Sequence, residues 1–347
     1  MRALTVEPKV ASSARLDDVP EPDPSQGDVL IAAHALGICG TDREIVAGQH
    51  GSAPAGGDRL ILGHESLGRV LEAPAGSGLS TGDWVACIVR HPDPVPCVSC
   101  AHDEWDMCQN GRYVEHGIKG LHGFAAERYR ESTRFVVRVD PRLAERGVLL
   151  EPASVVAKAW DQIEKIGRRA TWAPSRVLVT GAGPIGLLAA LLGVQRGLDV
   201  HVLDHATSGP KPQLVRDLGA TYHEGAVADV GPVDIVIECT GVPSVVLDAM
   251  RAARASGVVC LTGVSAPGKA LPVDIGELNR DLVLGNIVVF GSVNANRAHY
   301  DAGARALIKA DPRWLDRLFT RRVRLEDWAA GLEKQPGDVK TVLTFDT

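Results

Sequence analysis

The stretch TGAGPIG at residues 180–186 constrains the fold of this chain more than any other. It places Gly181, Gly183 and Gly186 in G-x-G-x-x-G spacing. The apolar run RVLVT precedes it, and PIGLLAALLGVQR, with the length and composition of a helix, starts inside it. A glycine-rich turn between a strand and a helix is typical of a dinucleotide-binding βαβ unit. We therefore expect a Rossmann-type nucleotide site here.

Each glycine of this turn has a separate expected role. Gly181 permits the tight turn, Gly183 lets the backbone approach a pyrophosphate, and Gly186 lets the helix lie close to the strand. The helix that begins at Pro184 and Ile185 would offer free N–H groups and a positive dipole to the anion.

Asp204 ends the next strand-like run, DVHVLD, 18 residues after Gly186. A carboxylate at this point accepts hydrogen bonds from the adenosine ribose and repels a 2′-phosphate, which favours NAD over NADP. Lys211 keeps NADP as the alternative, because its side chain could reach a phosphate in the same loop.

The segments after residue 176 alternate between strand and helix patterns. This alternation indicates βαβ units and a parallel sheet, so the fold class is α/β. We expect a helix over 242–257 and a mostly helical stretch over 299–334. Residues 1–150 instead hold short apolar runs separated by Gly and Pro, which predict a mainly β domain. Two domains suit a chain of 347 residues.

Composition excludes several classes of partner. The net charge of −6 leaves no basic surface for nucleic acid, and no charge run indicates a membrane patch. The longest apolar stretch, 185–194, is too short to span a bilayer. No secretion signal is seen, and three of the seven cysteines cluster, which favours a reduced compartment, the cytoplasm, and metal ligation.

Four residues of the chain are candidate ligands of a catalytic zinc ion. Cys39 lies in GICGTD, His64 and Glu65 in LGHES, and Glu151 before a segment that starts with Pro152. A thiolate, an imidazole and a carboxylate with one open position form a catalytic rather than a structural zinc set. No single residue is diagnostic; the case depends on their joint occurrence with a dinucleotide fold.

A second cysteine group lies in PVPCVSCAHDEWDMC. Cys97, Cys100 and Cys108 would supply three ligands, whereas a closed structural zinc site takes four. Two alternatives stay open. Either a nearby carboxylate or imidazole replaces the missing ligand, with Asp93 the first choice and His91 and His102 also near, or the lobe, about residues 91–110, holds no zinc.

The motifs GICGTD, LGHE, GDWV, the cysteine lobe, GAGPIG and ECTG occur in an order that resembles the zinc-dependent medium-chain alcohol dehydrogenases. The resemblance covers nearly the whole chain. Within the family the chain looks most like the microbial glucose dehydrogenases, through EHGIKGLHGFAAE, EPASVVAKAWDQIE and GSVNANRAHY. It implies a GroES-like catalytic domain over 1–155 and 295–347, with a Rossmann domain over 156–294.

The resemblance also implies roles for individual residues. The structural lobe of the family has a fourth cysteine where this chain has Pro94. Thr41 matches a hydroxyl that relays the substrate proton, and Glu65 would exchange with water on the metal. By the same resemblance, polar contacts to a sugar are expected from Thr41, Arg90, Glu115, Glu151 and Asn294. Further contacts to the cofactor are expected from Thr240, Gly241, Ser292 and Val293.

The sequence therefore predicts a zinc- and NAD-dependent enzyme that oxidises C1 of an aldose, D-glucose to glucono-1,5-lactone. The alternatives are a polyol or secondary-alcohol dehydrogenase and a non-catalytic dinucleotide-binding protein. Relatives of this architecture are dimers or tetramers, so we expect a homodimer or homotetramer.

Overall fold

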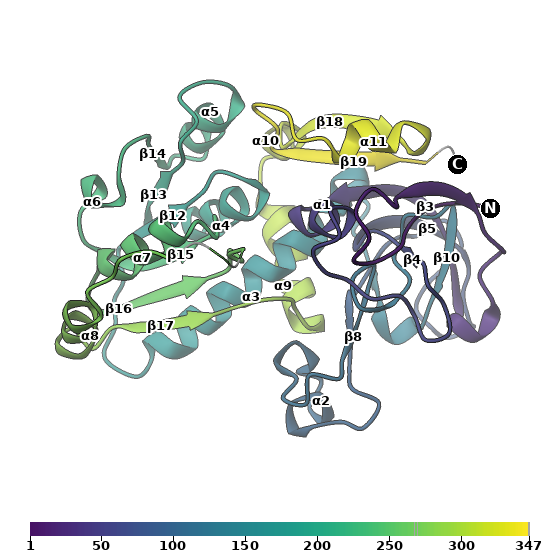
Figure 1. Cartoon of the computed structure of the whole chain (residues 1–347), viewed down its shortest axis with the longest axis horizontal. Coiled ribbons are helices and arrows are strands. Elements are labelled where there is room, and N and C mark those ends of the chain that lie inside the picture. The colour runs from purple at the N-terminus through teal and green to yellow at the C-terminus, as the bar shows by residue number, and fades with distance from the viewer. Residues whose placement is uncertain (267, 269, 346–347) are drawn as a thin grey trace. The chain divides into compact units, whose positions relative to one another are not determined.

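The computed structural model describes residues 1–266, 268 and 270–345 (Figure 1). The chain forms two compact units. Unit 1 combines Met1–Ser154 with Asn294–Thr347, and unit 2 is Val155–Val293. Helix α3, Leu150–Gly167, begins in unit 1 and continues into unit 2.

The main sheet of unit 1 is built around one long strand, β3. Its order is β11-β6-β5-β3-β19-β18, and β10 also pairs with β3. In the first half of β3, buried side chains alternate with less buried ones, as expected for a strand with one face on the core. The strands are β3 Val29–Ile38, β5 Glu65–Glu72, β6 Trp84–Cys87, β10 Arg128–Glu131, β11 Val136–Arg138, β18 Phe319–Arg324 and β19 Lys340–Thr344.

Two smaller sheets complete the β structure of unit 1. One has the order β2-β1-β4 and the other β7-β8-β9. Their strands are β1 Arg2–Val6, β2 Arg15–Asp18, β4 Leu60–Ile61, β7 Arg90–His91, β8 Val114–His116 and β9 Gly120–Leu121. The other helices of unit 1 are α1 Gly40–Val46, α2 Val98–Ala101, α9 Arg297–Lys309, α10 Pro312–Asp316 and α11 Trp328–Leu332.

The core of unit 1 joins the main sheet to the β1 sheet. Leu4, Ile31 and Phe124 are almost completely buried in one cluster with Leu60 and Leu343. Because β19 comes from the end of the chain and β3 from its beginning, this packing ties the two parts of unit 1 together.

Unit 2 is a six-stranded parallel sheet with the order β14-β13-β12-β15-β16-β17. The strands are β12 Arg176–Thr180, β13 Asp199–Leu203, β14 Thr221–His223, β15 Val233–Glu238, β16 Ala253–Leu261 and β17 Val288–Gly291. The helices are α4 Pro184–Val194, α5 Pro210–Asp217, α6 Val227–Val230, α7 Pro243–Ala252 and α8 Ile275–Leu284. The strand order reverses between β12 and β15, which is where such sheets bind ligands.

Two expectations about secondary structure were wrong. Helix α7 ends at Ala252, and residues 253–257 belong to β16, because Ala253 pairs with Val233 of β15. The segment 299–334 contains strand β18, which pairs in parallel with β19. Among the described residues, no helix is long and apolar enough to cross a membrane.

Candidate active site and cofactor site

Cys39, His64 and Glu65 meet inside unit 1. Their ligand atoms all lie within 4.8 Å of one another. Cys39 is the residue before helix α1, and Glu65 is the first residue of strand β5. His64 and Glu65 are buried, so this group of donors faces little water.

Asp42 holds two members of this cluster in place. It is completely buried, its Oδ2 accepts a hydrogen bond from the backbone N–H of Cys39 at 2.8 Å, and its Oδ1 lies 3.3 Å from His64 Nδ1. A carboxylate on Nδ1 leaves Nε2 free to bind a metal, which is the usual arrangement around metal-bound histidines. Burial disfavours a charged His64, but Asp42 outweighs burial and raises the pKa of His64 well above its ordinary value. The surroundings of His64 therefore stabilise a positive charge.

The carboxylate of Glu65 forms an ion pair with Lys340, which lies in strand β19. Lys340 also donates to the carbonyl of Ile38 at 3.2 Å. Gly37 makes room for this pair: a Cβ there would lie 2.1 Å from Glu65 Oε2. Sequence reasoning missed Lys340, because nothing in its local sequence distinguishes it from a surface lysine.

Glu151, predicted as a zinc ligand, does not belong to the group of atoms within 4.8 Å, but the charges of that group act on it. It is buried in the first turn of helix α3. Burial is the main cause that raises the pKa of Glu151 to about 7; His64 and Lys340 oppose this rise, and Glu65 and Asp42 add to it. A buried carboxyl that resists ionisation beside other carboxylates fits a site that takes up a cation. The donor set therefore fits Zn²⁺, which binds sulfur, nitrogen and oxygen ligands.

Thr41 is half-buried in the first turn of α1, two residues after Cys39. A proton relay requires its hydroxyl to lie near the substrate hydroxyl, and this role of Thr41 stays a prediction.

The lobe brings Cys97, Cys100 and Cys108 together, with their sulfur atoms within 4.8 Å of one another. Backbone N–H groups of Cys100 and Gln109 point at Cys97 Sγ from 3.5 and 3.3 Å and lower its pKa to about 6. A thiol that ionises this easily is a good zinc ligand.

The structure does not bring Asp93 into this cluster. Its carboxylate accepts hydrogen bonds from the backbone N–H of Val95 at 2.8 Å, from Asn110 at 2.8 Å and from Arg112 at 3.1 Å. These donors already occupy both oxygens, so the expectation of Asp93 as the fourth ligand gains no support. Pro94 sits next to it, and a ring without a donor atom cannot ligate.

Glu115 is the centre of the predicted sugar contacts. Its Oε1 accepts hydrogen bonds from Arg90 Nε at 3.0 Å and from Asn294 Nδ2 at 2.9 Å. Arg90 also donates to the carbonyl of Asp106 at 3.1 Å and stacks on Tyr113, with 3.7 Å between guanidinium and ring centre. The guanidinium is therefore committed to orienting Glu115.

In unit 2 the glycine-rich turn has the geometry that its spacing predicts. Gly181 has φ = +90°, which favours glycine. A Cβ on Gly186 would lie 1.8 Å from the carbonyl oxygen of Gly181, so only glycine fits this contact. A Cβ on Gly183 would meet nothing within 4 Å, which leaves room for a ligand. Pro184 and Ile185 begin helix α4 behind it.

Asp204 binds the turn directly. Its Oδ2 accepts a hydrogen bond from the N–H of Ala182 at 2.6 Å and lies 3.3 Å from Lys211 Nζ, while Oδ1 accepts from Ala206 N–H at 2.9 Å. Burial alone would raise the pKa of Asp204, but these donors outweigh burial and lower it. Asp204 therefore carries its negative charge at neutral pH.

The remaining predicted cofactor residues are also positioned by buried groups. Glu238, completely buried, accepts hydrogen bonds from the N–H groups of Thr240 at 2.7 Å and Gly241 at 3.2 Å. Ser292 is buried next to exposed Val293. Lys158 Nζ donates to the Val293 carbonyl at 2.9 Å. Sequence reasoning missed the role of Glu238, although this residue begins the motif ECTG and its contacts are local. It also missed Lys158, whose contact with Val293 is distant in sequence.

Comparison with known proteins gives consistent relatives over the whole chain. Residues 25–141 match the alcohol dehydrogenase GroES-like domain, and residues 144–345 match the glucose dehydrogenase C-terminus. The chain is 39% identical to a glucose 1-dehydrogenase of Methanocella arvoryzae, over 99% of both chains. It is 42% identical to glucose 1-dehydrogenase 1 of Caldivirga maquilingensis, over 100% of this chain and 99% of the other.

Among solved structures, the glucose dehydrogenase of Haloferax mediterranei in complex with NADP, Zn and gluconolactone superposes with a TM-score of 0.92. It shares 32% sequence identity with this chain, and all of both chains is covered.

Proposed function

This chain belongs to the glucose dehydrogenase branch of the zinc-dependent medium-chain alcohol dehydrogenases, and we propose that it oxidises C1 of an aldose, D-glucose to glucono-1,5-lactone. The observation that carries this proposal is the Cys39–His64–Glu65 cluster, with His64 and Glu65 buried and Asp42 next to His64. A non-catalytic dinucleotide-binding protein would have no use for such a set of metal donors.

Cys39, His64 and Glu151 would hold the catalytic zinc, and Glu65 would alternate with water. Zinc supplies Lewis-acid chemistry there, lowering the pKa of a hydroxyl group. Asp42 keeps the His64 ring in the productive tautomer. Thr41 would relay the proton of the C1 hydroxyl: its oxygen would accept that proton while its own hydroxyl proton passes on to solvent. The C1 hydride would pass to a nicotinamide cofactor, so that one proton and one hydride leave the sugar.

Glu115 and Asn294 would bind the other sugar hydroxyls. Their mutual hydrogen bond and the two donors of Arg90 fix the Glu115 carboxylate before substrate arrives. A fixed acceptor loses less entropy on binding than a mobile one. Arg90 thus supports the site by orienting Glu115.

NAD is the preferred cofactor in this proposal. The carboxylate of Asp204 is ionised and would repel the 2′-phosphate of NADP. Lys211 could attract that phosphate, but its ammonium group is already paired with Asp204. The turn at Gly181, Gly183 and Gly186, with Pro184 and Ile185, would bind the pyrophosphate; Thr240, Gly241, Ser292 and Val293 would contact the rest of the cofactor.

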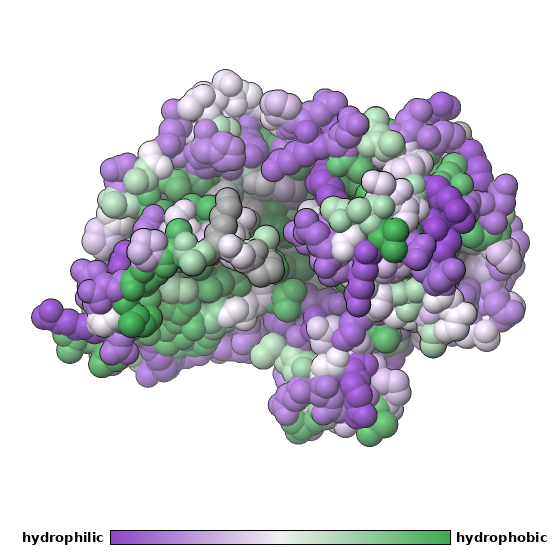
Figure 2. Space-filling view, in the orientation of Figure 1, coloured by the Kyte–Doolittle hydropathy of each residue, from purple (hydrophilic) through white to green (hydrophobic). Residues whose placement is uncertain are grey.

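We further propose that the chain assembles with copies of itself, as a dimer or tetramer, through one side of unit 2. Strand β17 is at the edge of its sheet and has one neighbour, β16. Apolar side chains gather on the face that carries α8 and β17 (Figure 2). Ile275, Val283 and Leu284 of α8 are 70%, 64% and 71% exposed. An edge strand beside such a surface invites pairing with a second chain.

We propose a reducing compartment such as the cytoplasm, since none of the seven cysteines forms a disulfide.

The experiment that tests the activity is a panel of D-glucose, D-galactose, D-xylose, glucose 6-phosphate, sorbitol and simple alcohols with NAD or NADP, with and without a chelator. Chelator-sensitive formation of a lactone supports the proposal. Formation of a ketone from sorbitol, with no turnover of any aldose, would assign a polyol dehydrogenase instead.

A further inference from the structure

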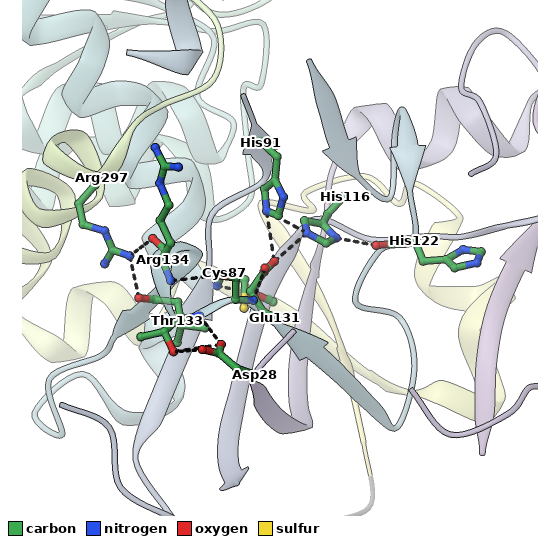
Figure 3. A network of polar contacts seen from close by, with 12 residues as sticks. Asp28, Cys87, His91, His116, His122, Glu131, Thr133, Arg134 and Arg297 are labelled. Atoms are coloured by element: carbon green, nitrogen blue, oxygen red, sulfur yellow. Dashed lines mark hydrogen bonds and ion pairs between the residues drawn. The ribbon is translucent and has the colours of Figure 1, made fainter. Parts of the chain in front are cut away.

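A third group of metal-binding side chains lies in unit 1, outside the sites described above. His91 ends strand β7, His116 ends β8 and Glu131 ends β10. Figure 3 shows both imidazole rings directed at the Glu131 carboxylate. One ligand atom of each residue lies within 4.8 Å of the others.

The distances among these three atoms suit a small cation. His91 Nε2 lies 3.3 Å from His116 Nε2 and 3.3 Å from Glu131 Oε2. Ligands on a tetrahedral zinc ion, with bonds of about 2.0–2.1 Å, are about 3.3 Å apart. The remaining separation, His116 Nε2 to Glu131 Oε2, is 2.7 Å and would have to open by about half an ångström to reach the same tetrahedral spacing.

The ring of His116 already has the orientation of a metal ligand. Its Nδ1 lies 2.6 Å from the carbonyl oxygen of His122 and donates a hydrogen bond to it. In the neutral ring this leaves Nε2 with a lone pair, directed at a carboxylate oxygen. Two acceptor atoms that close together need either a proton or a metal cation between them. A histidine whose second nitrogen donates to a backbone carbonyl is the common arrangement in zinc sites.

The surroundings of the Glu131 carboxylate also favour a bound cation. It is 1% exposed, and its Oε1 accepts a hydrogen bond from the backbone N–H of Ser132 at 2.6 Å. Among the described residues, no hydrogen bond of normal geometry reaches its buried Oε2, although both histidine nitrogens lie within ion-pair distance. A buried charged oxygen without an aligned donor is costly unless a cation neutralises it.

The cluster is also accessible to an ion. His91 and His116 line a cavity of about 750 Å³, together with His122 and Phe124. The cavity offers a route for a hydrated metal ion and space for water as the fourth ligand, which a three-residue zinc site needs.

We propose that His91, His116 and Glu131 bind a divalent transition-metal ion, Zn²⁺, in a site separate from both cysteine-containing clusters. Two imidazoles and a carboxylate match the ligand preferences of zinc. The ion joins the small β7-β8-β9 sheet to strand β10 of the main sheet, so its role is to fix the ribbon formed by β7 and β8.

The test compares zinc content in the full-length protein and three variants. Each protein is stripped with a chelator, reloaded with excess Zn²⁺, desalted and analysed for zinc per chain. His91→Gln is tolerable because the His91 side chain is partly exposed, and Glu131→Gln preserves the shape of the side chain. His50→Gln is the matched control: His50 Nε2 also pairs with a carboxylate, Glu44, at 3.1 Å, but no third ligand joins this pair among the residues that the structure describes.

We expect the wild type and His50→Gln to bind one zinc ion per chain more than His91→Gln and Glu131→Gln. Equal zinc content in all four proteins would overturn the proposal and leave a histidine–glutamate ion pair held by a proton.

A second measurement needs no substitution. A crystal of the wild-type protein grown with Zn²⁺ should show an anomalous peak between His116 Nε2 and Glu131 Oε2. A peak at Cys39 without one here would also overturn the proposal. Because the cluster at Cys39 is observed separately, failure of this site and failure of the proposed activity are distinguishable.

Discussion

The ammonium group of Lys340 forms an ion pair with the carboxylate of Glu65, and the two side chains are only 1% and 3% exposed. The pair brings together strand β19, near the end of the chain, and the first residue of strand β5. It leaves the metal-binding cluster with a neutralised carboxylate next to Cys39 and His64.

Replacing Lys340 with methionine should destabilise the protein by about 3–5 kcal/mol, because Glu65 would then be a buried charge without a partner. Chemical denaturation of the wild type and the variant measures the difference. The double variant Lys340→Met, Glu65→Gln should recover part of the loss. If the single variant is as stable as the wild type, the ion pair does not contribute to folding.

Asp42→Asn should lower zinc affinity about 10–100-fold, because the residue that orients His64 and caps Cys39 loses its charge. A competition titration with a chromophoric chelator measures the affinity. Asp248→Asn serves as the control, since Asp248 is exposed on helix α7 of unit 2, whereas the donors belong to unit 1. Equal affinities in the two variants would show that Asp42 does not act on the metal.

Asp204→Ala should narrow the preference for NAD over NADP, because the charge that repels the 2′-phosphate is lost while Lys211 becomes unpaired. The ratio of kcat/KM for the two cofactors is the measurement. Asp199→Ala removes the same charge from the other end of strand β13 and should leave the ratio unchanged. If the ratio of kcat/KM for NAD and NADP is the same in Asp204→Ala as in the wild type, Asp204 does not select the cofactor.

Glu115→Gln should raise KM for glucose about 10–100-fold with little effect on KM for the cofactor, since charged hydrogen bonds contribute about 1.5–3 kcal/mol. Arg90→Lys should raise KM for glucose and glucose 6-phosphate alike, because Arg90 acts by orienting Glu115. A selective loss on glucose 6-phosphate would instead mean that Arg90 binds the phosphate.

If the three lobe cysteines hold zinc, Cys100→Ser should lower the zinc content by one ion per chain, whereas Asp93→Asn should not change it. Asp93→Asn should have no effect because the Asp93 carboxylate accepts hydrogen bonds from Val95, Asn110 and Arg112 and does not belong to the cysteine cluster. Metal analysis of both variants checks this. Zinc loss in Asp93→Asn would restore Asp93 as the fourth ligand.

The parts of this protein that local sequence determines were predictable. The glycine turn, strand β12 and helix α4 follow from spacing and composition over a dozen residues, and the structure has them in place. Cys39 and His64 were found because each lies in a short motif. Their meeting in space depends on the pairing of β3 with β5, which no local pattern reveals.

The failures have a common physical cause. Residues 253–257 have helical composition, but parallel pairing with β15 overrides that preference. Strand β18, FTRRVR, is rich in arginine and lacks the alternation of apolar residues that predicts a strand. It is a strand because it pairs with β19. Lys340 and the group around Glu131 likewise depend on tertiary contacts.

Strands β7 and β8 carry two sets of side chains on opposite faces. Arg90 pairs directly with Glu115, so both point to one side, and their neighbours His91 and His116 point to the other. Inserting or deleting one residue in either strand would exchange the two sets. The sugar contacts and the proposed zinc ligands therefore depend on the same register between β7 and β8. Substitutions in these strands can alter one site alone, whereas a shift of the register would remove both sites at once.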